Sequence, residues 1–229
     1  MLPIHERFYS FQGEGVHLGR PAFFIRTFGC PLKCPWCDAA GTWHPKYIPD
    51  KIERISEEQL VKEAGETCCD FIVITGGEPI VHDLHLLVDL MHASNQSVHL
   101  ETSGYRMFPD ILDWVTLSPK RQNIPPPQSI ALADELKLII EQPSDVEWWL
   151  DTLRDQLGGN LDPNVPIWLH PEWSRRNDKA LLDGMVRWAL SGSANLRVGW
   201  QLHKLYAADF LDNRTKPPVP LGGDLKKGY

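Results

Sequence analysis

Three cysteines stand close together in the segment Cys30-Pro-Leu-Lys-Cys34-Pro-Trp-Cys37, with the spacing C-x3-C-x2-C. The segment follows an apolar run over residues 22–28 that is typical of a buried strand. Thiolates are soft ligands, and three of them from one short loop suit an iron–sulfur cluster. Three thiolates leave one iron of a [4Fe–4S] cube without a protein ligand. That iron would stay open to a non-protein ligand.

Two other interpretations of the cysteines are open. A structural zinc site would need a fourth ligand, and His44 lies close enough in the sequence to supply it. A disulfide is less favoured, because the chain has 5 cysteines, an odd number, and its first residues lack the apolar core of a secretory signal. The other two cysteines, Cys68 and Cys69, are predicted to be buried and inert.

Length and composition indicate one ordinary domain. The chain has 229 residues, of which 42% are hydrophobic and 23% charged, enough for a single α/β core. Its net charge is −7 and no basic cluster is longer than Lys226-Lys227, which argues against a nucleic-acid partner. No apolar run approaches the length that spans a bilayer, so no membrane is expected. We predict a cytoplasmic protein, because thiols stay reduced there.

Strand and helix patterns alternate along the chain. This order predicts parallel βαβ units, and therefore an α/β fold that forms an open partial (βα)6-type barrel. Residues 4–19 are expected to be an irregular entry and 122–129 a loop. Residues 1–212 are predicted to form one domain and 213–229 a Pro/Gly-rich tail. The predicted strands cover 21–28, 71–75, 97–101, 114–118, 135–140, 165–169 and 196–200, and the predicted helices cover 56–67, 82–93, 147–157 and 177–190.

Residues with chemical potential cluster at the expected strand ends, where ligands of parallel α/β folds bind. Arg26 interrupts an apolar strand near its carboxyl end and is either an anion clamp or part of an ion pair; we favour the clamp, because a guanidinium binds a carboxylate with two parallel hydrogen bonds. Glu14, between two glycines, either pairs with donors of a heterocycle or is a solvated turn residue. Gly76-Gly77-Glu78-Pro79 follows the next strand directly.

These motifs together resemble the radical S-adenosylmethionine superfamily. The cysteine spacing and the later Gly-Gly-Glu-Pro are similar to its cluster and cofactor motifs. The upstream Gln12-Gly-Glu-Gly15 and the late Gln-x-His-Lys look like its 7-carboxy-7-deazaguanine synthase branch, which belongs to queuosine biosynthesis and so to a tRNA modification pathway. The resemblance runs from about residue 4 to residue 204 and implies a radical S-adenosylmethionine fold.

The resemblance also implies a set of site residues. Cys30, Cys34 and Cys37 would hold the [4Fe–4S] cluster, and Glu14 and Arg26 would act on the substrate. His203 is either a pocket histidine or a satisfied core histidine, and His170-Pro171 stands where the family more often has Gln-Pro. The implied substrate contacts are Phe11, Gln12, Gly13, Glu14, Arg26, Thr75 and His203. The implied S-adenosylmethionine contacts are Trp36, Cys37, Asp38, Gly76, Gly77, Glu78, Ser118, Pro119, Lys120, His170, Pro171, Glu172 and Trp173.

The sequence departs from the family at Ala39. The family usually has Thr or Ser there, whose hydroxyl faces a magnesium ion, and alanine has no side-chain oxygen. Magnesium keeps several waters readily, so the loss of one ligand need not abolish its binding. Either the ion binds more loosely here, or another oxygen, such as that of Thr42, replaces the missing ligand.

By this resemblance the protein is a radical carbon–nitrogen lyase. S-adenosylmethionine would be cleaved to a 5′-deoxyadenosyl radical, which removes a hydrogen from C6 of 6-carboxy-5,6,7,8-tetrahydropterin. The ring then contracts and loses ammonia to give 7-carboxy-7-deazaguanine. Flavodoxin or ferredoxin would supply the electron, and a homodimer is expected. The alternatives are a glycyl-radical activase, which would act on a protein and need an open site, and a non-enzymatic iron–sulfur or zinc module.

Overall fold

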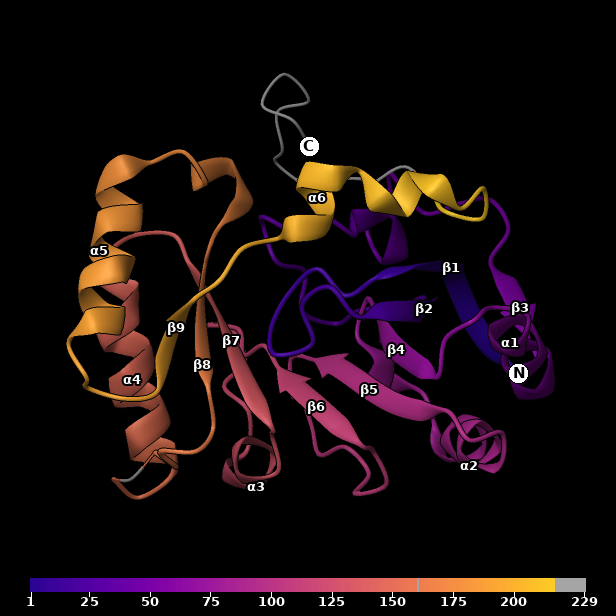
Figure 1. Cartoon of the computed structure of the whole chain (residues 1–229), viewed down its shortest axis with the longest axis horizontal. Coiled ribbons are helices and arrows are strands. Elements are labelled where there is room, and N and C mark those ends of the chain that lie inside the picture. Colours follow the sequence, from indigo (N-terminus) through magenta and orange to yellow (C-terminus); the bar gives the residue numbers. More distant parts are fainter. Residues whose placement is uncertain (160, 217–229) are drawn as a thin grey trace.

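The computed structural model describes residues 1–159 and 161–216, which form an α/β fold around one mostly parallel sheet (Figure 1). The strand order is β3-β1-β2-β4-β5-β6-β7-β8-β9. The strands are β1 (Leu2–Phe11), β2 (Pro21–Thr27), β3 (Glu53–Ile55), β4 (Phe71–Gly76), β5 (Ser97–Thr102), β6 (Trp114–Leu117), β7 (Glu135–Ile140), β8 (Ile167–Pro171) and β9 (Leu196–Val198).

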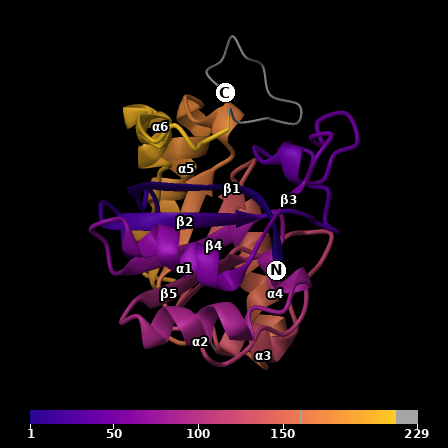
Figure 2. The same cartoon turned by 90° about the vertical axis from the view of Figure 1, so that its right-hand side faces the viewer.

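Helices cover the outside of this sheet, and α6 lies at the top of the molecule in both views (Figures 1 and 2). In both views α2 and α3 lie on the side of the molecule opposite α6. In the described part of the chain, no helix combines the length and the apolar character needed to cross a membrane. The helices are α1 (Glu57–Gly65), α2 (His85–Ala93), α3 (Pro127–Ala131), α4 (Asp145–Gln156), α5 (Lys179–Leu190) and α6 (Leu202–Tyr206).

The predicted parallel core is confirmed. Each of the pairings β2–β4, β4–β5, β5–β6, β6–β7, β7–β8 and β8–β9 is parallel, and the sheet does not close, because β3 and β9 stand at its two ends. The carboxyl ends of seven strands, β2 and β4 to β9, therefore meet along one rim. Ligands of such folds bind at this rim.

The predicted irregular entry over residues 4–19 is wrong for its first half. β1 is a strand of 10 residues that pairs antiparallel with β2, with Phe8 opposite Phe24. The consecutive polar residues His5, Glu6 and Arg7 hide its alternating pattern. They are tolerated because two of them have partners: Glu6 pairs with a β2 arginine, and Arg7 pairs with carboxylates on β3 and α1.

Several element boundaries differ from the prediction for local reasons. The helix predicted from residue 82 begins at His85, because a 3-10 turn, Pro79–Val81, comes first. The short helix α3 begins inside the loop predicted over 122–129 and has a proline at its start, where a missing N–H does no harm. The predicted N-cap Ser56 is confirmed, since its side chain accepts a hydrogen bond from the backbone N–H of Gln59.

Apolar side chains pack between the sheet and the helices. They include Leu60 on α1, Met91 on α2 and Trp149 on α4, and all three are buried. The prediction that both remaining cysteines are buried is wrong, since Cys68 is exposed and Cys69 half-buried in the turn before β4. Residues 217–229, most of the predicted tail, lie outside the described residues, and the division into domain and tail stays a prediction.

A buried carboxylate of the sheet fixes the loop that carries Glu14. Glu135 on β7 is 1% exposed. It accepts hydrogen bonds from the backbone N–H of Val16 at 2.8 Å, from the Thr116 hydroxyl at 2.5 Å and from the Trp168 indole at 2.8 Å. The loop after β1 is thereby tied to β6, β7 and β8.

We expect Glu135→Ala to lower the free energy of unfolding by about 3 kcal/mol or more, because each buried donor left without a partner costs about 1–3 kcal/mol. Urea denaturation of the cluster-free chain measures the change. Glu66→Ala, at the exposed end of α1, is the matched control and should change stability by less than about 0.5 kcal/mol. Equal effects of the two substitutions would contradict the anchoring role of Glu135.

Candidate active site

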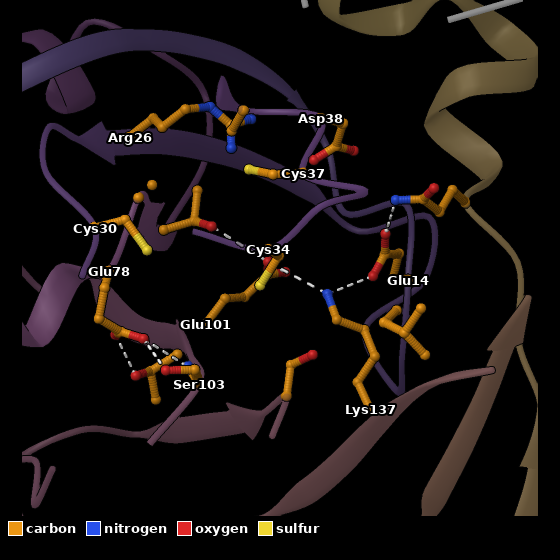
Figure 3. A pocket seen from close by; sticks show the side chains of 18 of the residues that line it. Glu14, Arg26, Cys30, Cys34, Cys37, Asp38, Glu78, Glu101, Ser103 and Lys137 are labelled. Atoms are coloured by element: carbon orange, nitrogen blue, oxygen red, sulfur yellow. Dashed lines mark hydrogen bonds and ion pairs between the residues drawn. The ribbon is translucent and has the colours of Figure 1, made fainter. Parts of the chain in front are cut away.

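One cavity of about 230 Å³ lies at the rim where the parallel strands end, and the predicted site residues converge on it (Figure 3). Of those residues, Gly13, Pro119 and His170 are not part of its lining. Those that line it are Phe11, Gln12, Glu14, Arg26, Cys30, Cys34, Trp36, Cys37, Asp38, Thr75, Gly76, Gly77, Glu78, Ser118, Lys120, Pro171, Glu172, Trp173 and His203.

The three cysteines of the C-x3-C-x2-C loop all line this cavity, and Figure 3 labels all three of them there. Burial raises the pKa of Cys37 to about 11, and the neighbouring Asp38 carboxylate adds to the effect. Such thiols become good ligands when a metal compensates the thiolate charge. Two side-chain N–H groups point at the loop's sulfurs, Gln122 at Cys34 and Trp43 at Cys37. Buried thiols with N–H donors suit a cluster.

His44, the fourth ligand of the zinc alternative, does not line the cavity. Its ring nitrogen Nδ1 accepts a hydrogen bond from the backbone N–H of Lys46 at 3.2 Å, and its ring packs on Tyr47. The histidine therefore makes contacts within its own loop, and the geometry favours the cluster over a zinc site.

Arg26 lines the cavity and also forms an ion pair. Its Nε lies 2.6 Å from the Glu6 carboxylate, and Glu6 is 7% exposed. The two interpretations of this arginine are thus compatible, because the ion pair orients a guanidinium that reaches the cavity. Figure 3 places Arg26 beside the cysteine loop, away from Lys137.

A buried ion network occupies the other side of the cavity. The Lys137 ammonium lies 2.5 Å from the Glu14 carboxylate and 3.6 Å from that of Glu101. Burial alone would raise the pKa of Glu14, but the Lys137 charge outweighs it and holds the pKa well below its usual range. The pKa of Glu101 is lowered by the same lysine against the effect of burial. Both carboxylates are therefore ionised in the folded protein.

Amide side chains complete this network. Gln201 donates to Glu14 at 2.8 Å, Gln12 donates to Glu101 at 2.9 Å, and the Thr75 hydroxyl donates to Glu101 at 3.3 Å. Lys137 and Glu101 were not predicted as site residues. For Lys137 the signal in the sequence is a pair of charges at alternate positions of an otherwise apolar strand, Glu135 and Lys137 on β7, which places both side chains on one face.

The Gly-Gly-Glu-Pro turn at the end of β4 is held in place by hydrogen bonds to its glutamate side chain. Glu78 is 1% exposed and accepts from the Thr102 hydroxyl at 2.5 Å and from both the backbone N–H, at 2.9 Å, and the hydroxyl of Ser103. A Cβ at Gly77 would lie 2.2 Å from the carbonyl oxygen of Gly29, so only glycine lets the turn approach the cysteine loop. Glu78 thus braces the turn, whose backbone lines the cavity.

Lys120 of the Ser-Pro-Lys turn is directed back toward the cavity. Its ammonium donates to the Ser118 hydroxyl at 2.7 Å and lies 5.5 Å from the centre of the Trp36 ring. Burial lowers the pKa of Lys120. On β8, His170 lies behind the lining and burial lowers its pKa to about 4; in the described part of the chain neither of its ring nitrogens has a hydrogen-bond partner.

Asp38, which lines the cavity, forms an ion pair with a lysine of α6. The Lys204 ammonium lies 2.8 Å from the Asp38 carboxylate, and it holds the Asp38 pKa well below its usual range although burial opposes this. Ala39 lines the cavity, whereas Thr42 is fully buried and donates its hydroxyl to the carbonyl oxygen of Ala39 at 2.7 Å. Thr42 is therefore poorly placed to replace the hydroxyl that the sequence lacks at position 39.

His203 on α6 lines the cavity, which places it among the pocket residues. It packs so closely on the loop after β1 that a Cβ at Gly13 would lie 2.1 Å from its Nδ1 atom. Gly13 thus makes room for the histidine and is not itself a lining residue. The backbone N–H of Leu202 donates to the Gly13 carbonyl oxygen at 3.0 Å, which fixes α6 over the cavity.

Comparisons with known proteins agree with this geometry. Residues 24–155 match the family model of the Radical SAM superfamily. The chain is 38% identical over 202 residues to the 7-carboxy-7-deazaguanine synthase of Synechocystis, covering 88% of this chain and 91% of the relative. It is 34% identical to the Flavobacterium psychrophilum protein of that name, covering 89% and 91%.

A solved structure supports the same assignment. The crystal structure of QueE from Escherichia coli superposes with a TM-score of 0.73 at 33% sequence identity, covering 88% of this chain and 94% of that one. Membership of the superfamily makes the protein a radical S-adenosylmethionine enzyme, a family whose members carry a [4Fe–4S] cluster and S-adenosylmethionine. The chain therefore belongs to the Radical SAM superfamily and, within it, to the 7-carboxy-7-deazaguanine synthase family.

Proposed function

We propose that this enzyme converts 6-carboxy-5,6,7,8-tetrahydropterin into 7-carboxy-7-deazaguanine with loss of ammonia. The observation that carries the proposal is the division of the cavity into two charged sides. A guanidinium, Arg26, stands beside the cysteine loop, and the Glu14–Lys137–Glu101 network stands across from it. A tetrahydropterin with a carboxylate at one end and N–H donors at the other matches this polarity.

Each side of the cavity has one task in this proposal. Arg26, oriented by Glu6, binds the substrate carboxylate through its forked donors. Glu14 accepts hydrogen bonds from the pyrimidine edge, and its ionised state suits it to N–H donors. Thr75, Phe11, Gln12 and His203 line the space between and exclude water from the reacting carbon.

The cofactors are assigned to the residues at the rim. Cys30, Cys34 and Cys37 would hold the [4Fe–4S] cluster, which when reduced supplies the electron that cleaves bound S-adenosylmethionine and starts the radical reaction. The backbone of the Gly76–Glu78 turn, the Ser118–Lys120 turn, Trp36, Asp38 and Pro171–Trp173 would hold S-adenosylmethionine. The buried ion network favours a small polar heterocycle over the protein substrate of an activase.

Three further properties are proposed from the family resemblance. The enzyme works in the cytoplasm, where a cluster is protected from oxidation. It receives its electron from a flavodoxin or a ferredoxin. It forms a homodimer, and sedimentation of the cluster-loaded protein measures that state.

The proposed reaction is tested by incubating the reduced, cluster-loaded enzyme with the tetrahydropterin and S-adenosylmethionine without oxygen. We expect mass spectrometry to detect 7-carboxy-7-deazaguanine. We also expect about 4 iron and about 4 sulfide per chain, because one cube is bound. Cys30→Ala should lose cluster and product together. Cys68→Ala is the control and should keep both, because Cys68 is exposed and outside the cavity lining. A loaded enzyme that leaves the tetrahydropterin unchanged would refute the proposal.

The role of Arg26 is separated from its ion pair by two variants. Arg26→Lys keeps the charge but loses the forked geometry, so substrate binding should weaken by about 1.5–3 kcal/mol, the usual range for a charged hydrogen bond. Glu6→Gln removes the ion pair and keeps the guanidinium. It should therefore lower the melting temperature and change the affinity for the substrate little. Isothermal titration and thermal melts measure both. Normal affinity in Arg26→Lys would show that this arginine only braces the strands.

Magnesium is expected to matter less here than in a relative with a hydroxyl at position 39. Water can fill the ligand position that Ala39 leaves open, so binding loosens. We expect wild-type activity to change little on chelation and Ala39→Thr to increase the dependence on magnesium. Thr42→Ala is the control, because its hydroxyl is held by the Ala39 carbonyl oxygen. Full magnesium dependence in the wild type that disappears in Thr42→Ala would establish Thr42 as the ligand instead.

A further inference from the structure

Two side chains outside the family motifs point N–H groups at sulfur atoms of the cysteine loop. The Gln122 amide nitrogen lies 3.1 Å from the Cys34 sulfur, and the Trp43 indole nitrogen lies 3.4 Å from the Cys37 sulfur. Both distances are within the range of hydrogen bonds to sulfur. The two donors come from different parts of the chain, since Trp43 follows the 3-10 turn Ala40–Thr42 and Gln122 follows the Ser118–Lys120 turn.

The orientation of the Gln122 side chain is fixed by a second bond. The same amide nitrogen donates to the carbonyl oxygen of Leu32 at 3.1 Å, inside the cysteine loop. If the amide were turned round, its oxygen would face that carbonyl oxygen, so the N–H group must face the loop. Residues 120 and 123 pair in an isolated bridge, which holds the turn that carries Gln122. The donor is therefore directed at Cys34 by the fold.

Trp43 is fixed in a comparable way. Its backbone N–H donates to the carbonyl oxygen of Ala40 at 3.2 Å, and its ring packs edge-on against His44 with 5.2 Å between ring centres. The indole lines the cavity beside Cys37. By contrast, the indole N–H of Trp36, in the same loop, donates to the Glu141 carboxylate at 3.0 Å. The direction of the Trp43 indole is thus a property of position 43 and not of the loop's tryptophans in general.

We infer that Gln122 and Trp43 are positioning residues that raise the reduction potential of the cluster by donating N–H hydrogen bonds to the sulfurs of Cys34 and Cys37. This inference rests on the cluster ligation proposed above. Reduction adds one electron, and part of the added negative charge resides on the ligand sulfurs. An N–H dipole aimed at a sulfur stabilises the reduced cluster more than the oxidised one, and hydrogen bonds to the sulfurs are a known control of cluster potential.

The limited exposure of the sulfurs makes these donors effective, although Gln122 itself is an exposed residue. Cys34 is 7% exposed and Cys37 is half-buried, so water screens the sulfurs poorly. Electrostatic interactions are stronger in such low-dielectric surroundings than in water. Gln122 also shares its turn with Lys120, whose ammonium lies over the Trp36 ring of the cysteine loop. The turn therefore contacts the loop at two points.

The test is a potentiometric titration of the cluster-loaded protein, with the reduced cluster followed by its electron paramagnetic resonance signal. At the potential that reduces half of the wild-type clusters, Gln122→Leu and Trp43→Phe should each lower the ratio of reduced to oxidised cluster about three- to tenfold. A tenfold change corresponds to about 59 mV for a one-electron couple. Gln122→Glu, which adds a negative charge, should lower the ratio further.

The matched controls change neighbouring groups whose N–H is not aimed at a sulfur. Trp36→Phe removes the indole that donates to Glu141, and Asn123→Leu removes an amide that donates to the carbonyl oxygen of Tyr105. Trp36→Phe should change the ratio of reduced to oxidised cluster by no more than about a third of the change in Trp43→Phe. Asn123→Leu should stay within the same fraction of the change in Gln122→Leu. Equal ratios in the two test variants and the wild type would overturn the inference.

Cluster loading separates this inference from the proposed ligation. Iron and sulfide counts on the wild type and on Cys30→Ala decide the ligation, independently of any potential. If both test variants fail to hold a cluster while both controls load normally, Gln122 and Trp43 are structural supports of the loop, and the inference is refuted. If one variant loads, its potential alone decides, because each donor is expected to act on its own sulfur.

Discussion

The site depends on a buried ammonium, Lys137, held between the carboxylates of Glu14 and Glu101. Buried ions are costly to desolvate, and the arrangement is stable only because each ion has further partners. Gln201 and Gln12 supply these partners to the two carboxylates. The loop after β1, the end of β5, strand β7 and the residue before helix α6 must all be in place for the network to form. The network therefore forms only where the fold brings these segments together.

The rest of the cavity is built where two turns approach the cysteine loop closely. The Gly-Gly-Glu-Pro turn contacts the cysteine loop through Gly77, and Glu78 ties that turn to the end of β5. The turn after β6 reaches the cysteine loop through Gln122. The cysteines are consequently braced from β4 and β6 as well as from their own strand. A loop held from several sides can keep its three cysteines at the wall of the cavity.

Much of this could be predicted from the sequence. The parallel strands β2 and β4 to β9 followed from their short apolar runs, and the cysteine spacing indicated the chemistry. β1 was missed because His5, Glu6 and Arg7 break its pattern, and the strand is possible because Glu6 and Arg7 have partners on neighbouring elements. Lys137, Glu101 and Gln122 were missed because their roles come from contacts between segments far apart in the chain. For Lys137 the signal was present, since a lysine two residues after an acid in an apolar strand needs a buried partner.

The central claim is that Lys137 keeps Glu14 and Glu101 ionised in a buried site so that they can accept N–H donors of the substrate. The most direct measurement is the affinity for 7-carboxy-7-deazaguanine, by isothermal titration between pH 5.5 and 8, roughly, in the wild type and in Lys137→Met. Without Lys137, burial should raise the carboxylate pKa values, so that protonation at the lower pH removes the acceptors. The account predicts that the Lys137→Met affinity is weaker than that of the wild type and falls more steeply as the pH falls. Equal affinities with the same pH dependence in both proteins would contradict it.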